Sequence, residues 1–389
     1  LIVESPDMER STELELIKRV LAHVAHKSTD MAAASSSLPV SRYYDQDRFA
    51  AEQKLIFGQL PRAVAHVSQI PDAGDFITLE AGEQPVLIVR TAEGGVNAFL
   101  NVCRHRGARL EWDAGGCGRK RFTCKYHGWV YDPDGALVGI PGSEGFPELN
   151  RDIHGLTRLP VEIRHGFVWI HPDPKGDLDV ASYLGSLDQE LSGFDLGRHI
   201  QFSPRRFPRK INWKLVIDTF LEGYHVRTAH QDTIAPMFYD NIGLSDQFGL
   251  HQRIVFPKIT FGEMIDQPEE NRSLRQHANV LYILFPNTMI LVQPDHMGVF
   301  HGYADGIDGV VVDASVLLPE APATDKARNY WQKNVDILFS ALDEDFELAE
   351  FVQAGVKTAA NEHLTFGRME KGLRWFHENV DRIVDGQDN

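Results

Sequence analysis

The sequence has few cysteines, no long apolar run and fewer basic than acidic side chains. Three cysteines among 389 residues are too few for a disulfide framework, and an odd number favours a reducing, cytoplasmic location. No apolar run approaches the ~18 residues of a membrane span. The acidic start also lacks the basic-then-apolar order of a secretion signal, so no membrane is expected. With 39 basic and 55 acidic residues, a net charge of −16, and no basic patch evident in the sequence, no nucleic-acid partner is expected.

The length predicts two domains, at ~100 to 200 residues per domain, and the local patterns predict where they lie. Residues 57–174 contain short runs rich in Val, Ile, Phe and Trp between turn residues, which predicts an all-β domain. Residues 175–389 mix helical and β-like segments, which predicts an α+β domain. Residues 1–56 are expected to form a helical segment that packs on this second domain.

Two helices and a linker are expected within residues 1–56. Leu14, Ile17 and further apolar residues recur at helical spacing over residues 11–26, and Thr12 with Glu15 matches a capping box at the start of that helix. Small and polar residues at 31–38 favour a linker. A second short helix is expected over residues 47–57.

All three cysteines fall within 22 residues of the predicted β domain. Cys103-x-His105 and Cys124-x-x-His127 are 18 residues apart, so two loops each offer one thiolate and one imidazole. Cys117 lies outside both pairs on a glycine-rich turn. It is therefore predicted not to be a ligand.

Three interpretations of this cluster compete. Two buried thiols with incidental histidines would need no metal. A structural zinc site would use the same two Cys and two His, but in the usual zinc finger both cysteines precede both histidines. In a Rieske [2Fe–2S] cluster, two Cys bind one iron and two His bind the other, which suits the order Cys, His, Cys, His.

These residues resemble a known family. The segments Cys103-x-His105-Arg-Gly and Cys124-x-Tyr-His127-Gly-Trp are similar to the Rieske domain in the large (alpha) subunits of Rieske non-haem iron oxygenases, the ring-hydroxylating dioxygenase-like superfamily. The resemblance covers about residues 38–380. It implies an α+β fold with an all-β Rieske domain and a helix-grip (START-like) catalytic domain built on an antiparallel sheet. It also implies that the four side chains bind a [2Fe–2S] cluster, namely Cys103, His105, Cys124 and His127.

The second domain carries a matching motif. After Asn-Trp-Lys, Glu222, His225 and His230 stand at spacings of three and five, and the family has an iron motif of this form. The resemblance implies that both histidines bind Fe(II) and that Glu222 is a catalytic residue that connects His225 to a Rieske histidine. Residues five apart lie about 140° apart around a regular helix. A helix irregularity is therefore expected at residues 226–229.

Two His ligands need a carboxylate to complete a 2-His-1-carboxylate site. In the C-terminal helix, Asp345 falls within an apolar stripe, whereas Asp343, Glu344, Glu347 and Glu350 are expected to point away. A carboxylate on a buried face needs a partner, and a metal ion is a suitable one. Asp345 is the predicted third ligand, with Asp343 as the alternative.

The resemblance implies a terminal oxygenase component. Electrons would pass through the Rieske cluster to the iron site, which would insert O2-derived oxygen into a small aromatic or hydrophobic substrate by hydroxylation or cis-dihydroxylation, in aromatic compound catabolism. An N- or O-demethylating or quaternary-amine monooxygenase is an alternative, and so is a Rieske electron carrier. Ile217, Asp218 and Glu222 replace residues typical of aromatic-ring members, which leaves the substrate class open.

Partner proteins are also implied. The sequence has no glycine-rich dinucleotide fingerprint after a strand, so a separate ferredoxin or flavin reductase is expected to supply electrons. In the family, transfer runs across the subunits of a trimer. The resemblance therefore implies a homotrimer, with or without a small beta subunit.

Overall fold

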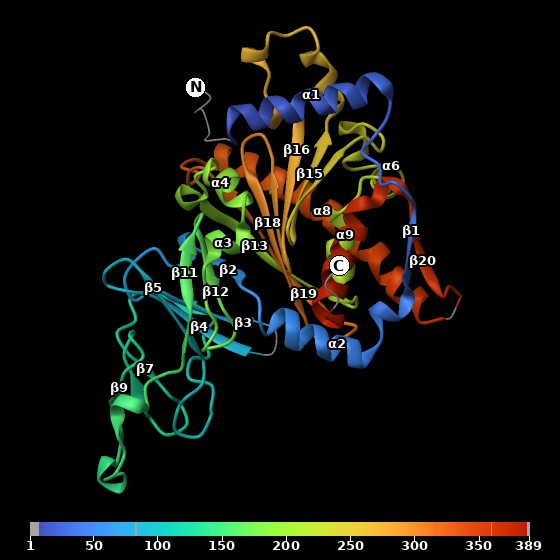
Figure 1. The fold of residues 1–389 in the computed structure, drawn as a ribbon. Helices are drawn as coiled ribbons and strands as arrows, with labels where there is room; N and C mark the ends of the chain where they lie inside the picture. The colour runs from blue at the N-terminus through green and yellow to red at the C-terminus, as the bar shows by residue number, and fades with distance from the viewer. Residues whose placement is uncertain (1–7, 82–83, 359, 387–389) are drawn as a thin grey trace. The chain divides into compact units, whose positions relative to one another are not determined.

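A computed structural model describes residues 8–81, 84–358 and 360–386 (Figure 1). The chain divides into two compact units. One unit is Phe57–Tyr183, and the other combines the residues before Phe57 with those after Tyr183.

The Phe57–Tyr183 unit is built from short antiparallel strands in three sheets, with the orders β10-β5-β4-β3-β6, β11-β12-β2 and β7-β8-β9. The strands are β2 (Arg62–His66), β3 (Phe76–Ala81), β4 (Gln84–Arg90), β5 (Val96–Leu100), β6 (Gly115–Gly116), β7 (Phe122–Thr123), β8 (Val130–Tyr131), β9 (Leu137–Gly139), β10 (Arg158–Leu159), β11 (Val161–Arg164) and β12 (Phe167–Ile170). A tight turn joins β8 to β9, where Gly135 has φ +80°, a left-handed conformation that glycine adopts without strain. The Asp132 carboxylate accepts hydrogen bonds from two backbone N–H groups of this turn.

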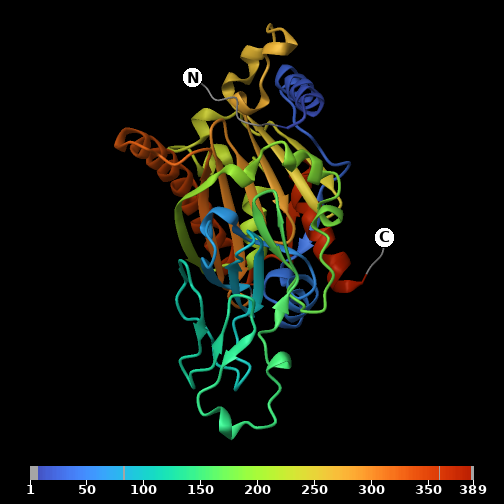
Figure 2. The same cartoon turned by 90° about the vertical axis from the view of Figure 1, so that its left-hand side faces the viewer.

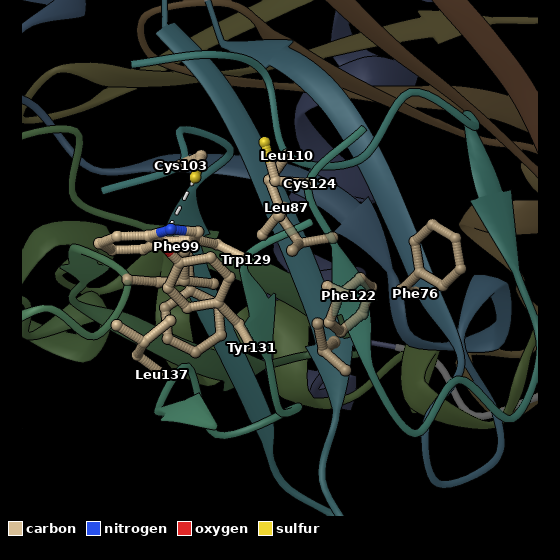
Figure 3. Close-up of a cluster of buried hydrophobic side chains, with 12 residues drawn as sticks. Phe76, Leu87, Phe99, Cys103, Leu110, Phe122, Cys124, Trp129, Tyr131 and Leu137 are labelled. Atoms are coloured by element: carbon tan, nitrogen blue, oxygen red, sulfur yellow. Dashed lines mark hydrogen bonds between the residues drawn. The ribbon is translucent and has the colours of Figure 1, made fainter. Parts of the chain in front are cut away.

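An apolar core lies beneath the two Cys-His loops of this unit. Figure 3 shows Cys103 and Cys124 with the core side chains Trp129 and Tyr131. All four side chains are buried. Packing against this core therefore holds the two cysteine side chains in position.

The larger unit contains a seven-stranded antiparallel sheet of order β13-β19-β18-β17-β16-β15-β14. Its strands are β13 (Ile200–Arg209), β14 (Leu244–Phe248), β15 (His251–Pro257), β16 (Ala278–Leu284), β17 (Thr288–Val292), β18 (Met297–Ala304) and β19 (Val310–Leu318). Two further strands, β1 (Ser36–Pro39) and β20 (His363–Phe366), pair with each other. The helices are α1 (Arg10–His26), α2 (Gln46–Glu52), α4 (Leu187–Ser192), α5 (Trp213–Phe220), α6 (Val226–Ala229), α7 (Leu274–His277), α8 (Asp325–Val356) and α9 (Lys371–Asp385), while α3 (Val180–Leu184) lies where the two units join in sequence.

The long helix α8 lies along the sheet in two views at right angles (Figures 1 and 2). The Thr324 side chain caps its start by accepting a hydrogen bond from the Ala327 N–H, which satisfies one otherwise unpaired donor of the first turn. Val335, Phe339, Leu342 and Phe346 recur at helical spacing and are buried. The buried stripe fixes which side of α8 faces the sheet.

The N-terminal segment departs in two places from its predicted structure. The helix α1 begins at Arg10 after Glu9, and no side chain caps it, so the predicted Thr12/Glu15 capping box is wrong: both residues lie inside the helix. The end of the predicted 31–38 linker is strand β1, because its backbone pairs with β20, a partner that is distant in sequence. The second predicted helix is present as α2 followed by a π-helical turn over Gln53–Phe57.

Candidate metal centres

The two Cys-His loops share one backbone geometry. The Cys103 carbonyl accepts a hydrogen bond from the Gly107 N–H at 3.0 Å, and the Cys124 carbonyl accepts one from the Gly128 N–H at 2.9 Å. Both glycines have a positive φ, of 73° and 71°, which any residue with a side chain would adopt only at a cost. The glycine in each motif therefore lets its loop turn back beneath the cysteine.

The imidazoles of the two loops lie against each other. The His105 and His127 ring centroids are 4.6 Å apart, and His105 stacks on Trp129 at 4.7 Å and 9°. Both thiols are buried and free, and the Cys103 sulfur lies 3.5 Å from the Tyr131 hydroxyl.

The donor set of these loops fits a Rieske cluster. His105 Nδ1 is buried and has no hydrogen-bond partner among the described residues, as expected for an atom that binds a metal. Desolvation and the neighbouring His127 lower the pKa of His105, which favours the neutral imidazole that a metal requires. Burial raises the pKa of the Cys103 thiol, so a bound cation would be needed to hold it as a thiolate.

Exposed basic side chains are concentrated in these loops and in the segment between them, although no basic patch was expected from the sequence. We call this group the basic rim and define it by five exposed side chains: Arg104, Arg106, Lys120, Arg121 and Lys125. Two exposed aromatic residues accompany it, because Arg106 lies over the Tyr126 ring and Lys125 over the Trp112 ring. The net charge of −16 concealed this patch, because an average over the chain carries no spatial information.

The larger unit brings together His225, His230 and Asp345. Asp345 Oδ1 lies 3.3 Å from His225 Nε2 and 3.0 Å from His230 Nε2. The candidate ligand atoms of all three residues lie within 4.8 Å of one another. Two imidazoles and one carboxylate form the donor set of the non-haem Fe(II) site that leaves positions open for O2. The residues therefore fit this metal.

The electrostatics around the three residues favour a bound cation. Burial opposes a charged His225, but hydrogen bonds to Asp345 and Glu222 outweigh it and raise the pKa of His225 to about 10. Burial works against a charged Asp345 as well, yet the two histidines lower its pKa. The surroundings of His225 are thus negative enough to retain a proton, and a divalent cation would displace that proton.

A break in the helix positions the two histidines. Helix α5 ends at Phe220, and the single-turn helix α6 occupies Val226–Ala229. His225 precedes α6, and His230 follows it with non-helical angles of φ −112° and ψ 33°. The predicted irregularity at 226–229 is therefore misplaced, because these residues are helical and the chain departs from the helix on either side of them.

Each histidine is held by a second carboxylate. Glu222 binds His225 Nδ1 and accepts a hydrogen bond from the His225 N–H at 3.1 Å. Glu344 Oε2 lies 2.6 Å from His230 Nδ1 and accepts a hydrogen bond from the Thr233 hydroxyl at 2.7 Å. Such contacts fix the tautomer and ring orientation of a metal-binding histidine.

The prediction that Glu344 points away from the site was wrong. Helical phase alone places its Cβ off the apolar stripe, but the longer glutamate side chain reaches back to His230. The adjacent Glu344-Asp345 pair was a usable signal, because two acids in a row can bind the two nitrogens of one imidazole from opposite sides.

The other acids of α8 serve different contacts. Asp343 forms an ion pair with Arg209 and its side chain is 52 % exposed, whereas that of Asp345 is 13 % exposed. The Glu350 side chain accepts a hydrogen bond from the Lys210 N–H. This division favours Asp345 over Asp343 as the third ligand.

An apolar cavity of about 110 Å³ opens beside the three candidate ligands. Strand and helix residues line it, including Phe238, Phe256, Leu281, Leu291 and Leu338. A small organic molecule in this cavity would lie next to a metal held by His225, His230 and Asp345.

The comparisons with known proteins match both units. Residues 61–150 match the Rieske [2Fe-2S] domain family, and residues 195–386 match the ring hydroxylating alpha subunit (catalytic domain) family. The chain belongs to the family of Rieske oxygenase alpha subunits. The predicted family and the α+β fold are therefore confirmed. The two matched domains imply one Rieske cluster and one mononuclear Fe(II) per chain, which confirms the predicted cofactors.

The similar proteins include both dioxygenases and monooxygenases. The alpha subunit of biphenyl 2,3-dioxygenase from Rhodococcus jostii (strain RHA1) is 36% identical over 52% of this chain and 45% of its own length. The glycine betaine monooxygenase oxygenase subunit from Chromohalobacter salexigens is 33% identical over 53% of this chain and 46% of its own. This chain thus aligns with about half the length of these relatives.

A solved structure shows the same fold over nearly the whole chain. The quaternary ammonium Rieske monooxygenase CntA, in complex with L-carnitine, superposes with a TM-score of 0.77 at 21% identity, covering 91% of this chain and 96% of that chain. At this identity the match concerns the fold alone. The roles of the individual Rieske and iron-site residues stay predictions.

Proposed function

We propose that this chain is the terminal oxygenase component of a Rieske-type mono- or dioxygenase. The observation that carries the proposal is the group of His225, His230 and Asp345 beside an apolar cavity, in a chain that also contains a Rieske domain. A Rieske electron carrier would have no use for this second site.

Each candidate residue has a defined task in this proposal. His225, His230 and Asp345 would hold Fe(II), which supplies the binding and activation of O2 when it is bound there. Glu344 orients the His230 imidazole through a hydrogen bond with its Nδ1, and Glu222 orients the His225 imidazole in the same way. The apolar cavity wall would limit the access of water to a bound substrate, which would reduce competing reactions.

The four Rieske-loop residues would hold the cluster through two thiolates and two imidazoles: Cys103, His105, Cys124 and His127. The Glu222 carboxylate is 12 % exposed, so a further hydrogen-bond donor can reach it. We propose that this donor is a Rieske-loop histidine of a neighbouring subunit in a homotrimer, with or without a small beta subunit. Glu222 would then connect the two metal sites.

The substrate in this proposal is a small aromatic or hydrophobic molecule that undergoes hydroxylation or cis-dihydroxylation, as in aromatic compound catabolism. The cavity favours it because the lining is mainly apolar. A demethylating or quaternary-amine monooxygenase is the second candidate, because a glycine betaine enzyme and a quaternary ammonium enzyme are among the similar proteins.

We propose a separate ferredoxin or flavin reductase as the electron donor. The basic rim suits an acidic protein surface, because complementary charge speeds encounter between proteins. Among the described residues, no helix is both long and apolar enough to span a membrane. A cytoplasmic location stays a prediction from the small number of cysteines.

A substrate panel tests the proposal. The purified, iron-loaded protein would receive electrons from a surrogate reductase and be offered aromatic hydrocarbons, aromatic acids and quaternary amines under ¹⁸O2. A product that is heavier by one or two labelled oxygens supports the proposal, and loss of a methyl group would favour the second candidate. An iron content of about two per chain instead of about three, together with no oxygenated product, would indicate an electron carrier.

A further inference from the structure

On the sheet side of the cavity, one polar side chain stands among apolar neighbours, and Thr219, Tyr239 and Asn241 line other parts of the cavity. Asn279 on β16 stands opposite Phe256 on β15, and Leu281, two residues further along β16, stands beside Leu291 on β17. All four line the cavity. Because alternate residues of a strand face the same side of a sheet, Asn279 and Leu281 share the face that borders the cavity.

The carboxamide of Asn279 is incompletely hydrogen-bonded. Its Oδ1 is buried and has no hydrogen-bond partner in the described part of the chain. A buried polar atom without a partner costs about 1 to 3 kcal/mol, so its presence in an apolar wall needs an explanation. A hydrogen-bonding group on a bound molecule would remove this cost.

The described lining of the cavity offers no Lys or Arg side chain to an anion. The lining acids Glu222 and Asp345 are already engaged by His225 and His230. A carboxylate placed here would lie near the carboxylates Glu222 and Asp345, and its cationic neighbour would be the metal held by the candidate ligands. A zwitterion such as carnitine or glycine betaine would therefore have no Lys or Arg in the described lining to hold its carboxylate.

We propose that the cavity binds a neutral, mainly apolar molecule that carries a hydrogen-bond donor, and that Asn279 contributes to specificity because its unpaired Oδ1 accepts a hydrogen bond from that donor. This inference rests on the proposed function only in the expectation that the bound molecule is then oxygenated. The binding itself does not depend on that function. The aromatic and aliphatic residues of the lining would supply apolar contact to the rest of the molecule.

Indole and indene test the proposal, because they have nearly the same shape and only indole has an N–H. Binding would be measured by equilibrium dialysis of the iron-loaded protein without oxygen or reductant. One retained hydrogen bond corresponds to about tenfold in Kd. We expect the wild type to bind indole about tenfold more tightly than indene, and Asn279→Leu, whose side chain has the same number of heavy atoms and the same branching, to bind the two within about twofold.

Two further variants keep this test interpretable. Leu291→Ala removes an apolar contact from the same wall and should weaken both ligands while preserving their ratio. Asn279→Ala should also remove the preference for indole over indene. Because alanine is smaller than asparagine, this variant can replace Asn279→Leu in the test if the leucine does not fit. Unchanged cluster absorbance and iron content would show that each variant is intact.

Two results would overturn the proposal. The first is an indole-to-indene ratio that is the same in wild type and in both Asn279 variants. The second is tighter binding of glycine betaine, carnitine or choline than of indole. Oxygenated products together with either result would leave the proposed function in place, whereas selective indole binding without any oxygenated product from the substrate panel would contradict the proposed function alone.

Discussion

The four candidate cluster ligands lie on two neighbouring loops between Cys103 and His127, and each loop closes with its own glycine turn. The candidate iron site instead brings the segment around α6, which follows the end of α5, together with helix α8, and its residues His230 and Glu344 are 114 positions apart in sequence. The first site depends on local turns, while the second depends on the packing of α8 against the rest of its unit. The comparison predicts that the two sites can be lost independently.

The largest effect is expected from Asp345→Ala. Removing the carboxylate should abolish binding of the mononuclear iron and lower product formation by about 100-fold or more, with the cluster absorbance unchanged. Metal analysis and the visible spectrum check both outcomes in one sample. The matched control is Asp343→Ala, which should lose only an exposed ion pair with Arg209. Iron loss in the control but not in Asp345→Ala would mean that Asp343 is the ligand.

The reverse experiment removes the cluster. Cys124→Ser should abolish the cluster absorbance and cluster iron, because serine is a much poorer iron ligand than thiolate, while about one iron per chain remains bound. Electron uptake from the donor should then stop. Cys117→Ser is the control, since Cys117 is exposed on its turn, and its spectrum should match that of wild type. Loss of the mononuclear iron in Cys124→Ser would show that the two sites are coupled.

A smaller effect is expected from Glu344→Gln. Changing a carboxylate that orients a metal-binding histidine typically lowers metal affinity by about 10- to 100-fold. Competition with a chelator would measure the Fe(II) affinity without turnover. Glu347→Gln, at an exposed position one turn along α8, should leave the affinity unchanged. Equal affinities in both variants would show that the Glu344 contact with His230 has no bearing on metal binding.

The same contrast explains how much the sequence could predict. The cluster ligands, Cys117 and the turn between β8 and β9 depend on residues near in sequence, so motif spacing is sufficient to propose them. Asp345 could be predicted as the third ligand among five acids because its position in the helical repeat places it on the apolar face of a long helix. For the residue next to it, Glu344, helical phase was misleading, since the reach of a side chain to a distant histidine depends on tertiary packing.

The remaining differences have the same cause. Strand β1 forms only because β20, more than 300 residues away, provides its partner, and a local reading of small polar residues favours a linker there. The role inferred for Asn279 requires knowledge of which strand face borders the cavity. The basic rim could not be seen in the net charge, although its residues crowd around the cluster motif in the sequence.

The smallest effect is expected from the basic rim. Reversing two exposed charges with Lys120→Glu and Arg121→Glu should slow electron uptake from an acidic donor several-fold at low ionic strength, and the difference should shrink as salt screens the charges. Stopped-flow bleaching of the cluster absorbance measures this rate. The control reverses two exposed charges on the other unit with Lys326→Glu and Arg328→Glu, and its rate should match that of wild type. An equal slowing of both variants would attribute the effect to net charge, and the rim would then have no special role in docking the donor.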